Sequence, residues 1–500
     1  MHRIKKVCVC LLVICMTVIS LKGMTDLSQR KSSDFKYRPF FEQEEDFDII
    51  FLGTSHVING IFPMELWNDY GFVSYNFGGH SNQLAVSYWV LKNVLDYTTP
   101  RLAVIDCLTL GTQTKTSQSF DYVHLSMDAF PPSITKWQAV SDLLDDQVMN
   151  ETAAAGNLAD AAKRTKMSLL WDYSVYHSRW NELSADDFMP GSSREKGAES
   201  RIAVSTPADV KKIASNQKLE GDTAGITYLR KILDECKSRG IEVLLVYLPF
   251  PASESEQKEA NRVYDIAGNY DVSYINFLDM DLTDYQTDCY DPASHLNPSG
   301  AKKVTDYLGD FISTHYDIPD RRQDEAYKSW HDSYADYKNY KAGHIKNQQA
   351  LDIYLMLLAD KNYNLFVEIR NPAVWKNKHY KRLLQNLGID TGKITKDTDA
   401  FVLKGGRHED SLKNFSACKK KEYQTALGTI RHVKNEDQSV SVYLDDSMLY
   451  SVDEVQNESM DIRIAVFDKD TMEVTDQAGF CIQDREDIAD DYLSVTGVVR

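Results

Sequence analysis

Short apolar runs alternate with amphipathic helical patterns between residues 46 and 316, and this alternation limits the fold more than any other feature of the chain. The runs are rich in β-branched residues and apolar at consecutive positions, as expected of strands buried on both faces of a parallel sheet. They cover residues 47–53, 73–78, 102–107, 241–248 and 272–277. Helical stripes at 85–95 and 226–239 lie between them. The pattern predicts an α/β fold with an open, doubly wound parallel sheet.

A polar stretch at residues 112–222 interrupts this alternation. It contains helical patterns such as 153–169, and it predicts a helical insertion. The insertion carries four aromatic residues that are expected either to line a sugar-binding groove or to form a helix core: Trp171, Tyr173, Tyr176 and Trp180.

A second domain is predicted after a charged, tyrosine-rich linker at residues 317–344. It covers residues 345–500 and opens with an amphipathic helix. Strand-like segments follow at 365–369, 440–444 and 462–467. This order of elements predicts an accessory domain of the α+β class.

The N-terminus combines a basic flank, Met-His-Arg-Ile-Lys-Lys, with fifteen uncharged residues at 7–21. A basic flank before an apolar run directs the following chain across a membrane. Residues 1–24 are therefore predicted to be a membrane anchor or a signal peptide. No Ala-x-Ala-like cleavage site lies near residues 21–23, which favours the anchor. The rest of the chain is expected on the extracytoplasmic face, or secreted if the segment is cleaved.

The formal net charge of −18 argues against nucleic acid, and against an anionic membrane surface, as the main partner. The histidines His56, His80 and His177 lack the spacing of metal ligands. We therefore expect neither a metal nor a cofactor.

The first chemically informative site is the sequence Phe-Leu-Gly-Thr-Ser-His that ends the first predicted strand at Gly53 and places Ser55 directly after it. Ligands bind at the carboxyl ends of strands in doubly wound sheets, so Ser55 is expected at that edge. The tight turn is expected to leave the backbone N–H groups of Ser55 and His56 available to an oxyanion. A serine directly after a strand is, alternatively, a common helix N-cap.

The second site precedes the last helical pattern of the α/β region. Asn297 followed by Pro298 is a strong N-cap and first-turn pair, so His295 is expected just before a fixed helix start. Serine is a poor nucleophile until a base takes its proton, and an acidic neighbour holds the imidazole in the correct tautomer. His295 is thus a candidate base for Ser55, with Asp291 as the nearest acid.

These motifs resemble the SGNH (GDSL-like) hydrolase family over residues 46–316. The resemblance is carried by the Gly-x-Ser turn at 53–55, by Tyr-Asn-Phe-Gly-Gly at 75–79, and by the Asp, His-Leu-Asn and Gly of 291–300. It is closest to the bacterial branch found beside membrane-bound O-acyltransferases in the modification of surface polysaccharides and teichoic acids. The resemblance implies that Ser55 is the nucleophile, His295 the base, Asp291 the acid and the Gly78 N–H an oxyanion donor.

Two departures from the family pattern affect these assignments. The family spacing is Asp-x-x-His, whereas Asp291 lies four residues before His295. Either the loop bulges, Asp288 takes the place of Asp291, or a Ser–His dyad acts alone. The family's Gly-x-Asn-Asp block is also missing after the third strand. Asn82 could supply the lost side-chain donor or cap the following helix instead.

The C-terminal region resembles the interleukin-like EMT-inducer, lectin-like domain at residues 364–371, 387–388 and 462–468, which implies carbohydrate binding. Loss of one oxyanion donor costs about 100–1000-fold in rate, which favours a weak hydrolase or a transferase over a fast esterase. The chain is thus expected to be an extracytoplasmic O-acyl transferase, with acetyl as the expected group. Its expected substrate is a cell-surface polysaccharide, and its expected partner an integral-membrane O-acyltransferase. The alternatives are a carbohydrate esterase and a non-catalytic glycan-binding or assembly protein.

Overall fold

The computed structural model describes residues 2–500 apart from 29–35, 38, 42–44, 118–119, 145–164, 172, 189–193, 212, 395–397, 405–409, 417–419, 426–427, 438, 453–459 and 484–492. Contacts divide the chain into two compact units. The first contains residues 1–200, 211–282 and 304–334, and the second 201–210, 283–303 and 335–500. The predicted ranges 46–316, 317–344 and 345–500 stay predictions. By contacts, residues 201–210 and 283–303 group with the C-terminal part of the chain.

A five-stranded parallel sheet forms the centre of the first unit, in the order β2-β1-β3-β4-β5. Each strand lies inside one of the five predicted apolar runs, so the mixed α/β class and the parallel sheet are confirmed. The strands are β1 (Ile49–Leu52), β2 (Ser74–Asn76), β3 (Leu102–Asp106), β4 (Glu242–Tyr247) and β5 (Ser273–Asn276). Every residue of β1 and β3 is buried, because helices cover both faces of the sheet.

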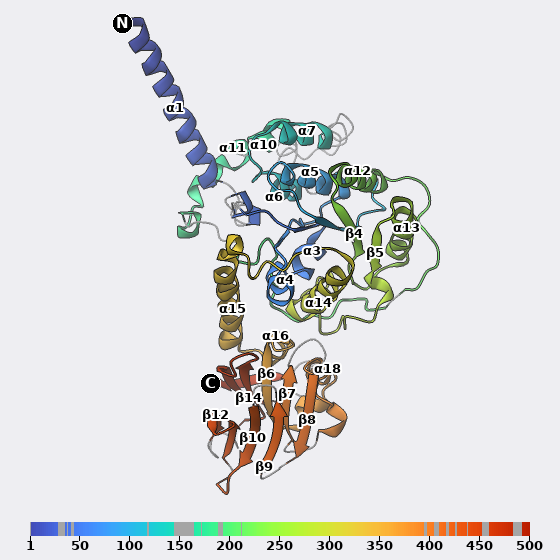
Figure 1. The fold of residues 1–500 in the computed structure, drawn as a ribbon, viewed down its shortest axis with the longest axis vertical. Coiled ribbons are helices and arrows are strands. Elements are labelled where there is room, and N and C mark those ends of the chain that lie inside the picture. Colours follow the sequence, from blue (N-terminus) through green and yellow to red (C-terminus); the bar gives the residue numbers. More distant parts are fainter. Residues whose placement is uncertain are drawn as a thin grey trace. The chain divides into compact units, whose positions relative to one another are not determined.

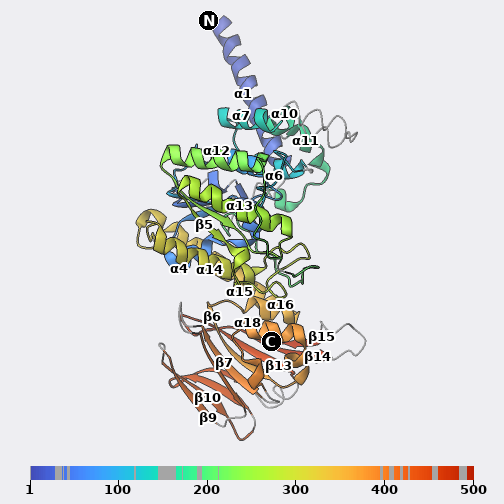
Figure 2. The same ribbon diagram turned by 90° about the vertical axis from the view of Figure 1, so that its right-hand side faces the viewer.

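Helices lie above and below this sheet (Figure 1). Figures 1 and 2 show α5 and α12 over one face, and α4 and α14 over the other. The helices that connect or follow the strands are α3 (Ser55–Gly60), α4 (Pro63–Tyr70), α5 (Leu84–Val94), α12 (Ala224–Arg239), α13 (Glu254–Tyr270) and α14 (Pro298–His315). The predicted start of α14 is confirmed, since Asn297 Oδ1 accepts from the N–H groups of Ser299 and Gly300.

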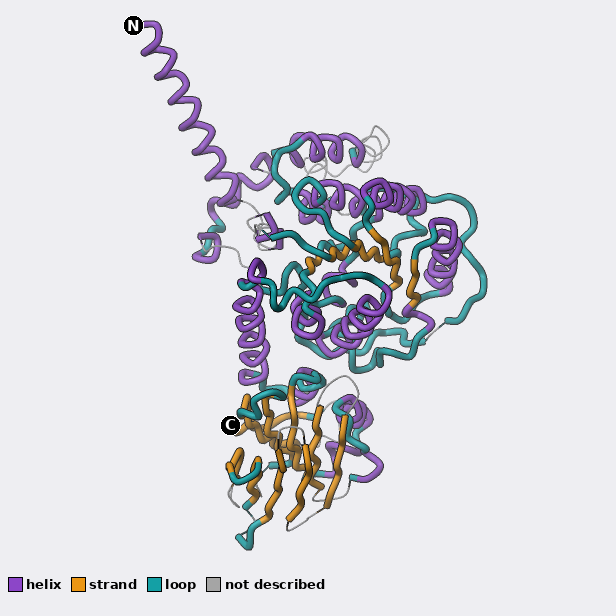
Figure 3. The backbone as a smooth tube through the Cα atoms, in the orientation of Figure 1, coloured by secondary structure: helices purple, strands orange, loops and turns teal. Residues whose placement is uncertain are grey.

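The insertion after β3 contains several short helices up to residue 188, as Figure 3 shows in purple, whereas its described residues from 194 to 222 form no helix. Its elements are α6 (Asp121–Met127), α7 (Ile134–Leu143), α10 (Lys166–Leu170), α11 (Tyr173–Tyr176) and the 3-10 helices η1 (His177–Asn181) and η2 (Ala185–Phe188). Most of the predicted helix at 153–169 lies outside the described residues.

The second unit contains two antiparallel sheets, with six strands in the order β15-β14-β13-β6-β7-β8 and four in the order β12-β11-β10-β9. Its strands are β6 (Tyr363–Ile369), β7 (Thr398–Lys404), β8 (Asp410–Ser416), β9 (Lys420–Thr425), β10 (Gly428–Lys434), β11 (Val440–Leu444), β12 (Ser447–Val452), β13 (Ile462–Asp468), β14 (Val474–Gln483) and β15 (Ser494–Val499). Side chains of both sheets, including Phe366 and Val442, share one core. The other face of the larger sheet is covered by α16 (Leu351–Leu357), α17 (Pro372–Lys376) and α18 (Lys378–Asn386). Helix α15 (Ser329–Asn347) precedes them.

The N-terminal helix α1 (His2–Ser28) includes the segment Ile4–Ser28, with a mean hydropathy of 2.4 and no buried residue in its most apolar window. By length and composition it is able to cross a membrane, either as an anchor or as a signal sequence.

Candidate functional site

The turn after β1 lies at the point where the strand order of the parallel sheet reverses. β2 lies on one side of β1 and β3 on the other, so the chain leaves the carboxyl ends of β1 and β3 in opposite directions. Ligands of open α/β sheets bind in the crevice at such a switch point. Ser55, the first residue of α3, is placed there by the end of β1 at Leu52.

Ser55 does not cap the helix that it begins. The N-cap of α3 is Thr54, whose side chain accepts a 3.2 Å hydrogen bond from the backbone N–H of His56. The alternative interpretation, that Ser55 is a helix N-cap, is therefore wrong. The expectation that the His56 N–H is available to an oxyanion is also wrong, because Thr54 occupies it. The corresponding role of the Ser55 N–H stays a prediction.

Asp106 supports this turn from the end of β3. Its Oδ2 accepts a 3.3 Å hydrogen bond from Thr54 Oγ1, and its Oδ1 has no hydrogen-bond partner among the described residues. Gly53 has φ +152°, and a Cβ at that position would lie 2.6 Å from Asp106 Cβ, so the approach of the two strands requires glycine. Asp106 was not predicted from the sequence. The available signal was a carboxylate at the last position of a buried strand beside the switch point.

Burial raises the pKa of Asp106 from 3.8 to about 7, and hydrogen bonds from Leu248, Thr54 and Leu108 only partly oppose that rise. Between about pH 4 and pH 7, the Asp106 carboxyl is therefore protonated in the folded chain and ionised in the unfolded chain. Stability is expected to fall as the pH rises through this interval, by about 1.4 kcal/mol for each unit of the pKa shift.

Asp106→Asn is expected to remove this part of the pH dependence, because the amide keeps an acceptor for Thr54 and does not titrate. The measurement is the free energy of unfolding of both chains, in the same detergent, at several pH values between 4 and 8. Relative to the variant, wild type should be most stable at the acidic end. Parallel curves for the two chains would contradict the assignment.

The Gly78 N–H, expected to be an oxyanion donor, is engaged in this structure. It donates to Asn76 Oδ1 over 3.0 Å, while Asn76 Nδ2 donates to the carbonyls of Val57 and Ile61. On the other side of Gly78, the buried Lys36 Nζ donates to its carbonyl oxygen. Burial lowers the pKa of Lys36 to about 8. The role of Gly78 as an oxyanion donor stays a prediction. It requires that the Gly78 N–H leave Asn76 Oδ1 and donate to the oxyanion instead.

Asn82 is buried beside the turn after β2 that contains Gly78 and Gly79. Its Oδ1 accepts a 2.8 Å hydrogen bond from Ser126 Oγ, whereas its Nδ2 has no hydrogen-bond partner among the described residues. A Cβ on Gly79 would collide with Asn82 Nδ2, so the amide lies directly against the backbone of the turn. The alternative role of Asn82 as a helix cap is wrong, because the N-cap of α5 is Gln83 and forms no side-chain capping bond.

Asn82→Ala is expected to lower kcat about 100–1000-fold if this amide stabilises an oxyanion. The matched control is Asn93→Ala, which removes a buried asparagine whose Nδ2 donates to the Trp89 carbonyl within α5. The control should cost stability and leave kcat unchanged. Equal losses of kcat in both variants, measured by turnover of an activated acyl ester, would show that Asn82 has only a structural role.

His295 and Asp291 form a doubly hydrogen-bonded pair. The His295 Nδ1 lies 2.9 Å from Asp291 Oδ2, and the His295 backbone N–H donates to Asp291 Oδ1 over 3.0 Å. The His295 side chain is 19% exposed and that of Asp291 is 27% exposed. The pair thus leaves Nε2 as the ring nitrogen not facing the carboxylate, which is the arrangement that a general base requires.

The longer Asp–His spacing is accommodated by the loop. Ser294 has φ +76°, and its N–H donates to the Asp291 carbonyl, so the chain turns back and brings the two side chains together. Asp288 is wholly buried and has other partners: Ser299 Oγ donates to its Oδ1, and Lys303 Nζ to its Oδ2 over 2.6 Å. Among the three alternatives, the geometry agrees with the bulged loop.

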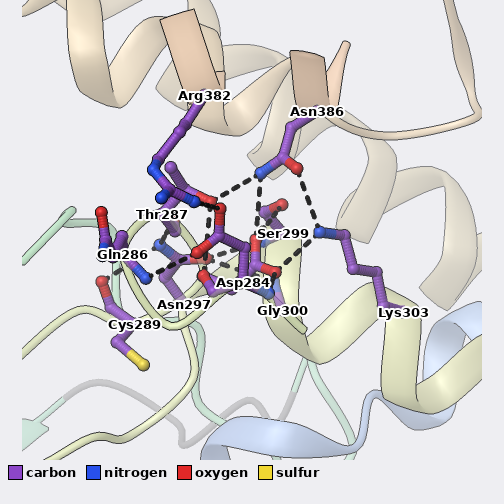
Figure 4. Close-up of polar contacts among 11 residues, drawn as sticks. Asp284, Gln286, Thr287, Cys289, Asn297, Ser299, Gly300, Lys303, Arg382 and Asn386 are labelled. Carbon is purple, nitrogen blue, oxygen red and sulfur yellow. Dashed lines mark hydrogen bonds and ion pairs between the residues drawn. The ribbon is translucent and has the colours of Figure 1, made fainter. Parts of the chain in front are cut away.

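A polar network attaches the loop that carries this pair to α18 (Figure 4). From α18, Arg382 Nη1 donates to Asp284 over 2.8 Å, and Asn386 Nδ2 donates to Thr287 Oγ1 over 2.8 Å.

Within the loop, Asn297 Nδ2 donates to the carbonyls of Thr287 and Cys289. Cys289 pairs with Leu296 in a bridge that closes the turn containing Asp291 and His295. The α18 contacts therefore determine where this turn is held within the second unit.

A second histidine–carboxylate pair differs in exposure. His124 Nδ1 lies 2.8 Å from Asp128 Oδ1 at the same sequence spacing, but the His124 side chain is fully buried. The His295 side chain is therefore partly accessible to solvent, whereas the His124 side chain is not, so exposure distinguishes the two pairs.

The structure brings His295 and Asp291 together in the second unit, while Ser55, Gly78 and Asn82 lie in the first. The described residues contain no group of three or more His, Cys, Asp or Glu side chains able to hold a metal ion. Comparisons of the chain with models of protein families, with curated proteins and with solved structures found no match.

Proposed function

We propose that the chain is a membrane-anchored, extracytoplasmic O-acyltransferase of the SGNH type that modifies a cell-surface polysaccharide. The observation that carries the proposal is the partly exposed His295, held by both oxygens of Asp291. The position of Ser55 at the switch point of the parallel sheet, without a capping role, supports it.

In the first half-reaction His295 Nε2 accepts the proton of Ser55 Oγ, and Oγ attacks the carbonyl carbon of an acyl donor. The Asn82 amide donates to the negative oxygen that forms. The bond to the leaving group then breaks, the imidazolium returns the proton to that group, and Ser55 carries the acyl group as an ester. Asp291 keeps the imidazole in the correct tautomer and stabilises its protonated form.

In the second half-reaction a sugar hydroxyl replaces the departing group. His295 accepts its proton, the hydroxyl oxygen attacks the acyl-serine, and the proton returns to Ser55 Oγ as the new ester leaves. An esterase would use water at this step. We propose the integral-membrane O-acyltransferase as the donor and the C-terminal sheets as the site of polymer recognition, on the family resemblances and on the basic residues at the start of α1.

The test loads the full chain, in detergent, with p-nitrophenyl acetate and follows the acetyl-enzyme by intact mass. Surface polysaccharide is then added, and transfer to glycan is compared with loss of acetyl to water. Faster transfer to glycan supports the transferase, whereas loss to water alone indicates the esterase. A folded chain that forms no adduct, with or without the membrane partner, would contradict both and leave a binding protein.

A further inference from the structure

Exposed apolar side chains gather on the helical insertion. Six large apolar residues between positions 134 and 188 are 42–78% exposed. Single exposed apolar residues are common on proteins, but a concentration of this kind marks an interaction site. We call this set the insertion patch; it consists of Ile134, Trp137, Met167, Trp171, Trp180 and Phe188.

The insertion patch faces away from the helix cores. On α7, Ile134 is 78% and Trp137 is 59% exposed, while Ala139, Val140 and Leu143 are buried. The outward side of a surface helix normally carries polar residues, and α7 reverses this rule at both positions. Of the two predicted roles for the aromatic residues of the insertion, a helix core agrees with Tyr176, which is buried. It does not agree with Trp180, which is 72% exposed.

Contacts between neighbouring elements connect the patch to the end of α1. Helix α7 contacts α10, α10 contacts α11, and both α11 and η1 contact α1. Figure 1 shows α11 beside the C-terminal end of α1, with α10 and then α7 farther from it. Arg179 of η1 joins them, since its guanidinium donates to the Ser28 carbonyl over 2.9 Å and to Asp187 over 3.0 Å.

The exposure of α1 changes where it meets these elements. Its described side chains are exposed from Ile4 to Met24 and become covered from Thr25 to Ser28. At 1.5 Å per residue the exposed part is about 31 Å long, close to the hydrocarbon thickness of a bilayer at about 30 Å. The insertion elements that contact α1 thus lie at the end of the segment that would cross the bilayer.

We propose that the insertion patch docks on the surface of the bilayer that α1 crosses. Trp137, Trp171 and Trp180 would lie at the boundary between headgroups and acyl chains, where tryptophan is enriched in membrane proteins. The occupant is lipid rather than protein because η1, which carries Trp180, contacts the end of α1. The contact is apolar, so zwitterionic lipid suffices despite the net charge of −18. The proposal rests on α1 remaining in the chain as an anchor.

The test uses tryptophan quenching in the full chain, reconstituted into phosphatidylcholine vesicles with or without bromine on the acyl chains near the headgroup. Of the seven tryptophans, Trp67, Trp89 and Trp330 are buried, so quenching by lipid reports the exposed ones. Wild type is expected to lose the emission of the patch tryptophans in brominated vesicles. The combined variant Trp137→Phe, Trp171→Phe and Trp180→Phe should show no such loss, and Trp375→Phe is the matched control that should retain it.

Flotation of the same vesicles reports separately whether α1 anchors the chain. Quenching that disappears only in the triple variant supports docking of the patch. A chain that floats with vesicles but is not quenched, or whose quenching survives the triple substitution, would overturn the proposal and point to a protein partner on this surface. A chain that does not float would overturn its premise that α1 is an anchor. None of these outcomes depends on the activity of Ser55.

Discussion

Ser55→Ala is expected to abolish the covalent adduct of the chain with a fluorophosphonate probe and to lower acyl transfer by about 10⁴- to 10⁶-fold. The physical reason is that the adduct requires an activated hydroxyl, and alanine has none. The measurement is intact mass after incubation with the probe, together with release of p-nitrophenol from the acetyl ester. Because Thr54, not Ser55, caps α3, the substitution should leave the N-cap of this helix intact.

The matched control is Ser253→Ala. Ser253 also begins a helix after a strand of the parallel sheet, but its side chain accepts from the Glu256 N–H and forms a capping box at α13. Its loss is expected to cost about 1 kcal/mol of stability and to leave probe labelling intact. If Ser55→Ala keeps the adduct, the nucleophile is another residue, and peptide mapping of the adduct would identify it.

His295→Ala is expected to lower acyl transfer as severely as the loss of Ser55, because no base then takes the serine proton. Asp291→Asn is expected to lower kcat by about 10⁴-fold, since an amide favours the wrong tautomer of the imidazole. KM should change little in both variants, because neither side chain is assigned to ground-state binding of the substrate. The measurement is kcat and KM for the activated acyl ester, with probe labelling as the second readout.

His315→Ala is the control for the histidine. It removes an exposed histidine at the end of α14 whose Nδ1 lies 2.8 Å from the Phe311 carbonyl oxygen and whose ring stacks on that of Phe311. Full activity of Asp291→Asn, alongside an inactive His295→Ala, would show that a Ser–His dyad acts alone. Full activity of both variants would contradict the assignment of the base.

The strands of the parallel sheet and those of the C-terminal sheets differed in how far they could be predicted. The inner strands β1 and β3 are almost continuous apolar runs, because both of their faces are buried. The edge strands β2 and β5 also contain serine and asparagine. Only β6, β11 and β13 were recognised among the ten antiparallel strands. Strands such as β9, with the sequence Lys-Lys-Glu-Tyr-Gln-Thr at the edge of its sheet, carry no such signal. Their structure depends on the partner strand rather than on their own composition.

The residues of the candidate site also differ in how far they could be predicted from the sequence. The positions of Ser55 after a strand and of His295 before the Asn297–Pro298 helix start are local, and both could be predicted. Asp106 was missed because its effect on Thr54 acts across two strands that are 52 residues apart in the chain. The orientation of Asn82 by Ser126, over 44 residues, was missed for the same reason.

The sequence by itself thus determined the elements whose cause is local: the buried parallel strands, the start of α14 after Asn297, the apolar helix α1 and the identity of the candidate nucleophile and base. Only the tertiary structure decided that Thr54 caps α3, that Asp291 reaches His295 through a turn at Ser294, and that α18 holds this turn. Periodicity and capping act within a few residues and are therefore visible in one segment. Burial, pKa shifts and hydrogen-bond partners depend on residues that only folding brings together.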